Sequence, residues 1–138
     1  MLKVVLMLIV SSVILFGATE SFYKKKYDFY IKKVEKSFKQ WQHLELLTSL
    51  SENFLSQTSS LNNQIYGYLD ETEESRDARQ EERDAEKALK IEQQEAKEEH
   101  NTYIEYIDKI TELSFTAEEE LGKLPEWFKV PEEKKGNF

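Results

Sequence analysis

From residue 20 to residue 121 the chain contains a single glycine, Gly67, and no proline. These two residue types are the strongest markers of turns and of the ends of short strands. Alternating β-branched runs bounded by turn pairs are also missing. Apolar residues recur instead at spacings of three and four, which is the period of an amphipathic helix. The sequence therefore predicts an all-α fold.

The first helix is expected to span about residues 20–55, because an apolar stripe runs along it and shifts once on the way to Phe54. Ser56–Ser60 (SQTSS) favours a break, since Ser and Thr prefer turns and caps to helix interiors. A second helix would begin near Leu61. It would kink near Gly67–Asp70, where Asp70 and Glu73 fit a capping box. The stripe begins with Tyr27, Ile31, Val34, Phe38 and Trp41.

Charge is distributed unevenly along the chain and predicts how the helices pair. Residues 20–41 hold 7 bases and 3 acids, whereas residues 70–120 hold 19 acids and 7 bases. A turn near residue 58 would set the lysines of residues 24–39 beside the acids of residues 77–92, and exposed ion pairs help to select an alignment. The same turn sets bulky residues against small ones, as close helix packing requires. The pairs expected are Leu47 with Leu69, Phe38 with Ala78, Ile31 with Ala85, and Tyr27 with Leu89.

The acidic stretch of residues 70–100 has an alternative reading as a lone solvated helix or a partly disordered segment. Beyond it, a straight helix would outrun the start of the first one, so a break near His100–Thr102 is expected. Thr102 with Glu105 fits a capping box that would restart the chain as a third helix. A second box, Thr116 with Glu119, would open a short helix that Gly122 closes. The expected fold is thus an antiparallel helical hairpin, or a small three-helix bundle or coiled coil, over residues 19–121.

Residues 122–138 contain both prolines and predict an irregular C-terminal tail. Leu124, Trp127, Phe128 and Val130 give this tail an apolar side. These side chains either pack back on the helices, as terminal apolar residues usually do, or present a short motif to a partner.

Residues 1–18 read as a signal peptide, because a short basic lead precedes the apolar run Val4–Phe16 and the small residues Gly17 and Ala18. The run is also shorter than the ~20 residues that span a bilayer. A retained membrane anchor is the alternative. Phe16 stands where a cleavage site needs a small residue, and aromatic and basic residues follow as they do at a membrane interface. Those interface residues are Phe22, Tyr23, Lys24, Lys25 and Lys26.

Residues that could carry chemistry are few. The chain has no cysteine and two histidines, His43 and His100, which lie far apart in sequence. Neither histidine has a partner at a metal-site spacing, and no phosphate-binding loop or nucleophile motif occurs. A net charge of -8 argues against nucleic acid. We therefore expect no enzyme, no cofactor, no metal and no small-molecule substrate.

The function predicted is that of a small exported protein, periplasmic or secreted, that acts through protein contacts. It would be an adaptor, a chaperone-like clamp or a component of an envelope assembly, and it would bind a protein partner or itself. Aromatic and leucine side chains dominate such interfaces. The residues expected to bind the partner are Trp41, Leu44, Leu47, Trp127 and Phe128.

The alternative function is that of a single-pass membrane tether, which follows if the N-terminal segment is retained. A short amino end, one apolar segment and a charged helical ectodomain make the layout of the chain. This layout resembles that of phage inner-membrane spanins, and the resemblance implies a helical rod that links the bilayer to a partner.

Overall fold

The computed structural model describes the backbone of residues 2–67 and 71–134 and the side chains of residues 19–67 and 71–134. Two helices, α1 (Leu2–Tyr66) and α2 (Glu73–Leu121), form its regular structure, and these described residues include no strand. The all-α prediction is confirmed. The chain divides into two compact units, one of residues 1–36 with 102–135 and one built around residues 37–101.

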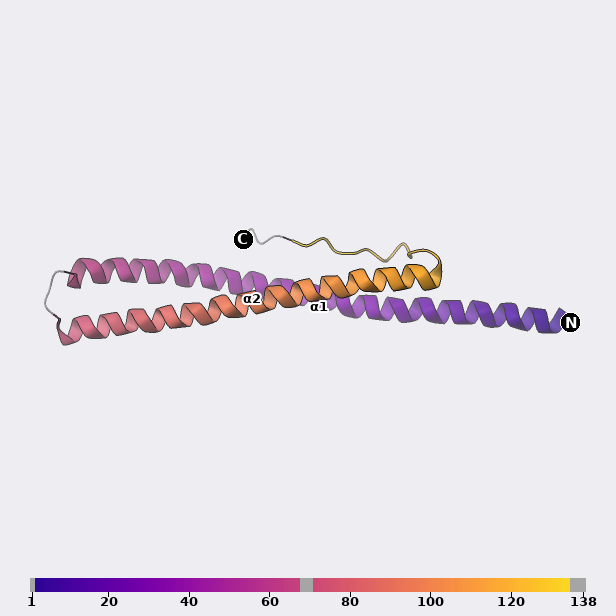
Figure 1. The fold of residues 1–138 in the computed structure, drawn as a ribbon, viewed down its shortest axis with the longest axis horizontal. Helices are drawn as coiled ribbons and strands as arrows, with labels where there is room; N and C mark the ends of the chain where they lie inside the picture. The colour runs from indigo at the N-terminus through magenta and orange to yellow at the C-terminus, as the bar shows by residue number, and fades with distance from the viewer. Residues whose placement is uncertain (1, 68–70, 135–138) are drawn as a thin grey trace. The chain divides into compact units, whose positions relative to one another are not determined.

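The unit of residues 37–101 is a helical hairpin, in which the second half of α1 and the first half of α2 lie side by side (Figure 1). Asn62 Nδ2 donates to the carbonyl oxygen of Ala78 at 3.3 Å near the connection. Farther along, the rings of Trp41 and His100 contact each other with their centroids 4.3 Å apart and their planes tilted by 47°. The two segments are therefore antiparallel, as the sequence predicted.

The connection of the hairpin lies later in the chain than expected. The backbone N–H of Gly67 donates to the carbonyl of Asn63 at 3.0 Å, at the end of α1. Thr72 and Ser75 then form the capping box of α2, with each side-chain oxygen accepting from the other residue's N–H at 3.0 and 3.1 Å. The expected box of Asp70 with Glu73 is not the one observed, and Asp70 lies outside the described residues.

The predicted break at Ser56–Ser60 is wrong, because α1 runs through it. Serine lowers helix propensity by only about half a kcal/mol per residue, and the segment gains packing from Asn62, which is buried against α2. The predicted register is wrong for the same reason. Ala78 lies beside Asn62 rather than Phe38, and the lysines of residues 24–36 belong to the unit of residues 102–135.

The predicted break at His100–Thr102 and the separate helices after it are also wrong, since α2 is continuous to Leu121. A buried stripe with a period of seven residues explains the continuity, because such a repeat keeps one side of a helix against its partner. Thr102 and Thr116 lie inside this helix, so neither of them begins a new one. The buried stripe comprises Ser75, Leu89, Ala96, Tyr103, Ile110 and Ala117.

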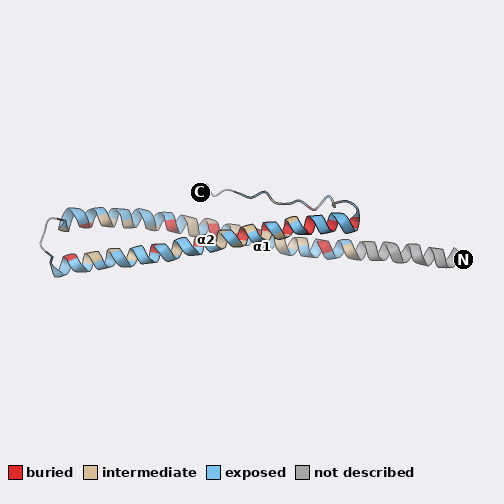
Figure 2. Ribbon diagram, in the orientation of Figure 1, coloured by how far each residue is buried: buried red, intermediate tan, exposed pale blue. Residues whose placement is uncertain are grey.

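The unit of residues 1–36 and 102–135 holds the better core. Tyr103 and Ile110 are its largest fully buried side chains, and Tyr23 and Val34 of α1 are buried in the same unit. Figure 2 shows buried positions gathered on the last turns of α2, whereas the helix ends near the connection are mostly exposed. Stability is therefore concentrated in this unit.

α2 ends where Gly122 adopts a φ of 80°, the left-handed conformation that closes many helices. The tail that follows is not helical through residue 134. The side chains of residues 1–18, on which the signal-peptide and anchor readings depend, lie outside the described residues, so both readings stay predictions. In the part of the chain whose side chains are described, no helix is long and apolar enough to cross a membrane.

Candidate contact surfaces

The most unusual feature of the hairpin is the side of α1 that faces away from α2. Leucine, isoleucine and phenylalanine side chains recur there at spacings that keep them on one side of the helix. Leu50 is 57% exposed and Phe54 is 64% exposed. We call this set the outer apolar stripe. It comprises Leu46, Leu47, Leu50, Phe54, Leu61 and Ile65.

The opposite side of the same helix segment, which packs on α2, includes polar residues. Thr48 is only 7% exposed, and its hydroxyl has no hydrogen-bond partner. Asn62 is buried, and Glu52 accepts a hydrogen bond from Gln93 of α2 at 3.1 Å. Trp41 and the half-buried Leu44 and Leu55 also lie on this inner side, yet buried polar residues interrupt it while larger apolar side chains stay exposed on the other side.

The residues predicted to bind a partner are divided by the structure. Trp41 is buried in the hairpin, where its Nε1 donates to Glu45 at 3.2 Å and its ring meets His100. Leu44 is half-buried, and Leu47 is exposed on the outer apolar stripe. Sequence reasoning missed Leu50, Phe54, Leu61 and Ile65 as surface residues. The spacing of seven between positions 47, 54 and 61 was the signal that could have found them.

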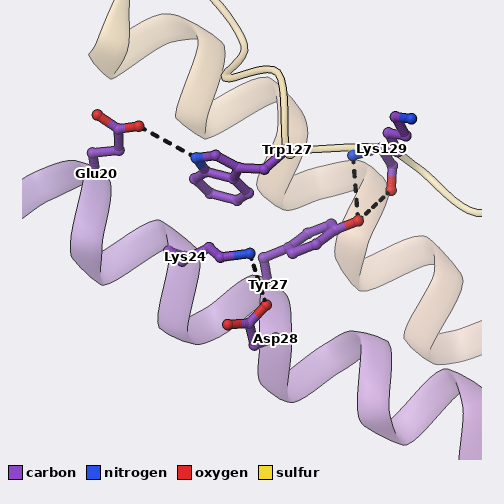
Figure 3. Close-up of polar contacts among 6 residues, drawn as sticks. All are labelled: Glu20, Lys24, Tyr27, Asp28, Trp127 and Lys129. Carbon is purple, nitrogen blue, oxygen red and sulfur yellow. Dashed lines mark hydrogen bonds and ion pairs between the residues drawn. The ribbon is translucent and has the colours of Figure 1, made fainter.

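The other two predicted contact residues, Trp127 and Phe128, pack on α1 of their own unit, and Figure 3 shows Trp127 beside Tyr27. Their ring centroids lie 5.4 and 4.7 Å from that of Tyr27. The Tyr27 hydroxyl donates to the carbonyl of Lys129 at 3.0 Å, and Trp127 Nε1 donates to Glu20 at 3.3 Å. The tail was expected either to pack back on the helices or to present a short motif to a partner, and the structure shows that it packs back on the helices.

A further hydrogen bond holds the tail at Lys134. The Lys134 N–H donates to the Tyr103 hydroxyl at 2.9 Å, and Tyr103 is itself buried in the core of the unit. Phe128 is buried as well. The tail therefore completes the core of its unit.

The exposed side of α1 in this unit is basic and aromatic. The ammonium of Lys26 lies 5.0 Å from the ring centroid of Phe22, and that of Lys33 lies 5.5 Å from Phe29. Both phenylalanines are more than half exposed. Lysines that share this side lie at positions 25, 26, 32, 33 and 36. Together they form a basic aromatic face with no acidic residue among them.

Three of the five predicted membrane-interface residues, Phe22, Lys25 and Lys26, lie on this face. Lys24 does not, because it pairs with Asp28 at 3.2 Å and its ammonium lies 4.8 Å from the Trp127 ring (Figure 3). Tyr23 points into the core. Burial, a hydrogen bond to Glu120 and the charges of Glu120 and Glu119 raise the pKa of Tyr23 to about 12.

Groups that could hold a metal do not gather among the side chains of residues 19–67 and 71–134, where no three His, Asp or Glu residues lie together. A hollow beside the connection is lined by three arginines, two of which make hydrogen bonds within the hairpin. Arg79 bonds Asn63 at 2.8 Å, and Arg83 bonds Gln80 at 2.8 Å. The hollow is lined by Tyr66, Glu71, Ser75, Arg76, Arg79 and Arg83.

Comparison of the chain with protein-family models, with curated proteins and with solved structures finds no match.

Proposed function

We propose that this chain is an exported helical protein that acts through protein contacts, as an adaptor, a chaperone-like clamp or a component of an envelope assembly. The outer apolar stripe is its contact surface. One observation carries the proposal: α1 buries Thr48 and Asn62 against α2 and leaves Leu50 and Phe54 exposed. Contiguous apolar surface of this kind marks interaction sites on soluble proteins.

The free energy that a partner would gain by covering the outer apolar stripe supports a contact role. Fully burying a leucine or phenylalanine side chain is worth roughly 1.5–3 kcal/mol. The six stripe side chains are 38% to 64% exposed, so each retains about half of that gain, or roughly 1 kcal/mol. A partner that covered all six would gain roughly 6 kcal/mol before the costs of association. Association costs about 4–15 kcal/mol, so a stable contact needs a partner that buries apolar surface of its own against the stripe.

Site-specific photo-cross-linking in cells that express the full chain tests this proposal. A photoreactive residue at Phe54 should give a discrete covalent adduct. The same residue at Lys87, an exposed position on α2, is the matched control and should give none. Equal labelling at the two positions, or none at Phe54, would remove the outer apolar stripe as the contact surface.

A second candidate function, the single-pass tether, is favoured by the basic aromatic face. Interfacial aromatic residues and lysines anchor a helix at the surface of an anionic membrane, and Phe22 and Lys26 lie together on this face. A tether should keep Met1 in its intact mass and stay with membranes through an alkaline carbonate wash. A soluble species that begins at Thr19 would exclude the tether and support export with cleavage.

A further inference from the structure

We infer that the outer apolar stripe binds a second copy of this chain, α1 against α1, in a parallel and in-register pair. The inference rests on the proposed function, because it names the partner of that same surface. It begins with the spacing of the stripe. Leu47, Phe54 and Leu61 are seven residues apart, and Leu50 lies three residues after the first of them. This is the a and d pattern by which two helices pair in a coiled coil.

Charge identifies what kind of surface fits the stripe. Residues 46–66 contain one charged side chain, Glu52, and that carboxylate is bonded to Gln93 of α2 on the side away from the stripe. The flanking positions are neutral, being Ser51, Asn53, Thr58 and Ser60. A charged partner would find no complement here. A second copy presents the same neutral and apolar surface, so the two stripes meet without like-charge repulsion.

The acidic helix α2 does not oppose this pairing. It packs on the side of α1 opposite the outer apolar stripe, so two paired copies would keep α1 between their α2 helices. Packed helices lie about 8–10 Å apart, which places the two α2 helices about 25–30 Å from each other. This separation is several times the screening length of about 8 Å at physiological salt. The net charge of -8 on each chain is therefore compatible with a pair.

Two polar positions on the same side of α1 as the outer apolar stripe favour the parallel alignment. Gln57 and Gln64 continue the d positions after Leu50, and both are exposed. In a parallel pair each amide meets its own counterpart, and an amide can donate to and accept from another amide. In an antiparallel pair Gln57 would face Phe54 and Gln64 would face Leu47, which leaves the amides without partners at a cost in stability. Single polar residues at such positions are known to fix helix register.

The test uses the purified full chain, which has no native cysteine. Leu50→Cys in a parallel pair sets the two thiols beside each other, so mild oxidation should yield a disulfide-linked dimer. In an antiparallel pair Leu50 of one copy faces Leu61 of the other. The two Leu50 positions then lie about 16 Å apart along the helix axis, which is too far for a disulfide. Ile91→Cys, an equally exposed apolar position on α2 at 61%, is the control and should stay monomeric. No Leu50→Cys dimer would overturn the inference.

Sedimentation equilibrium of the same full chain checks the non-covalent pair. Phe54→Lys should raise the dimer dissociation constant about 100-fold, because a two-fold interface loses the side chain in both copies. Ile91→Lys should leave it unchanged, and association through the apolar run at residues 4–16 would instead leave Phe54→Lys unchanged as well. A chain that is monomeric throughout would overturn the second copy as partner. If Phe54 still photo-cross-links to another protein, the proposed function survives this failure, and if it does not, both fail.

Discussion

Thr48 offers a prediction in which removing a polar group should stabilise the protein. Its side chain is buried between α1 and α2, and its hydroxyl has no hydrogen-bond partner. Leaving a buried hydroxyl unpaired costs about 1–3 kcal/mol, whereas valine fills the same space without that cost. We expect Thr48→Val to raise the free energy of unfolding by about 1 kcal/mol. This is the lower end of the range, because small shifts in packing around the new methyl group offset part of the gain. With a typical denaturant slope an increase of about 1 kcal/mol moves the urea midpoint upward by about 0.5 M.

The assay should report on the hairpin alone. In a Trp127→Phe background the remaining tryptophan, Trp41, is buried in the hairpin beside His100, so its fluorescence follows this unit. Thr72→Val is the matched control in the same unit, because the Thr72 hydroxyl accepts a hydrogen bond from the Ser75 N–H at 3.1 Å and its loss should lower the stability instead. A Thr48→Val variant that is less stable than its parent would refute an inward-facing and unpaired hydroxyl.

Three further predictions concern the unit of residues 1–36 and 102–135, each measured by denaturant unfolding. Ile110→Ala should lower the free energy of unfolding by about 2–5 kcal/mol because the side chain is 0% exposed, whereas the exposed Ile91→Ala should change it by less than about 0.5 kcal/mol. Gly122→Ala should cost about 1 kcal/mol, since its φ of 80° strains any residue with a β-carbon. The folded Tyr23 has a pKa of about 12 against 10.0 unfolded, so its stabilising contribution is complete below pH 10 and is lost as the pH rises to 12. Tyr23→Phe should flatten that loss, and an unchanged slope would contradict the assignment.

The all-α class and the antiparallel hairpin could be predicted from the sequence because both depend on local properties. A stretch of about a hundred residues with one glycine and no proline has few alternatives to helix, and a three-four apolar period repeats along it. Ion pairs between side chains on the same helix could be predicted from local spacing in the same way. The spacing of Glu86 and Lys90 favours an i, i+4 ion pair, and the structure has one at 3.9 Å.

The register could not be predicted, because it depends on tertiary packing that competes with local preference. Ser56–Ser60 was a reasonable break, yet the helix passes through it and turns only after Gly67. That delay lengthens the first arm and lets α2 continue past Thr102 without outrunning its partner. Local propensities of a few tenths of a kcal/mol per residue are too small to decide such a choice.

The contact surface was missed for a related reason. Two apolar sides coexist on α1, and the sequence does not say which of them meets α2. The aromatic side chain of Trp41 suggested a surface anchor, but the structure buries it, while Leu50 and Phe54 stay outside. The period of the sequence shows which residues share a side of a helix. Only the packing of the partner helix decides which of these sides stays exposed to solvent.

The distance between residues 38 and 78 tests the register of the hairpin, and with it the outward direction of the apolar stripe, most directly. Spin labels at Phe38 and Ala78, diluted with unlabelled chain so that only intramolecular pairs count, measure it by pulsed electron resonance. Ala78 lies beside Asn62, and the 24 residues from 38 to 62 span about 36 Å of helix. The structure therefore predicts a separation of about 36 Å. A separation below about 20 Å would place Phe38 against Ala78, contradict this register, and leave the outer apolar stripe without its basis.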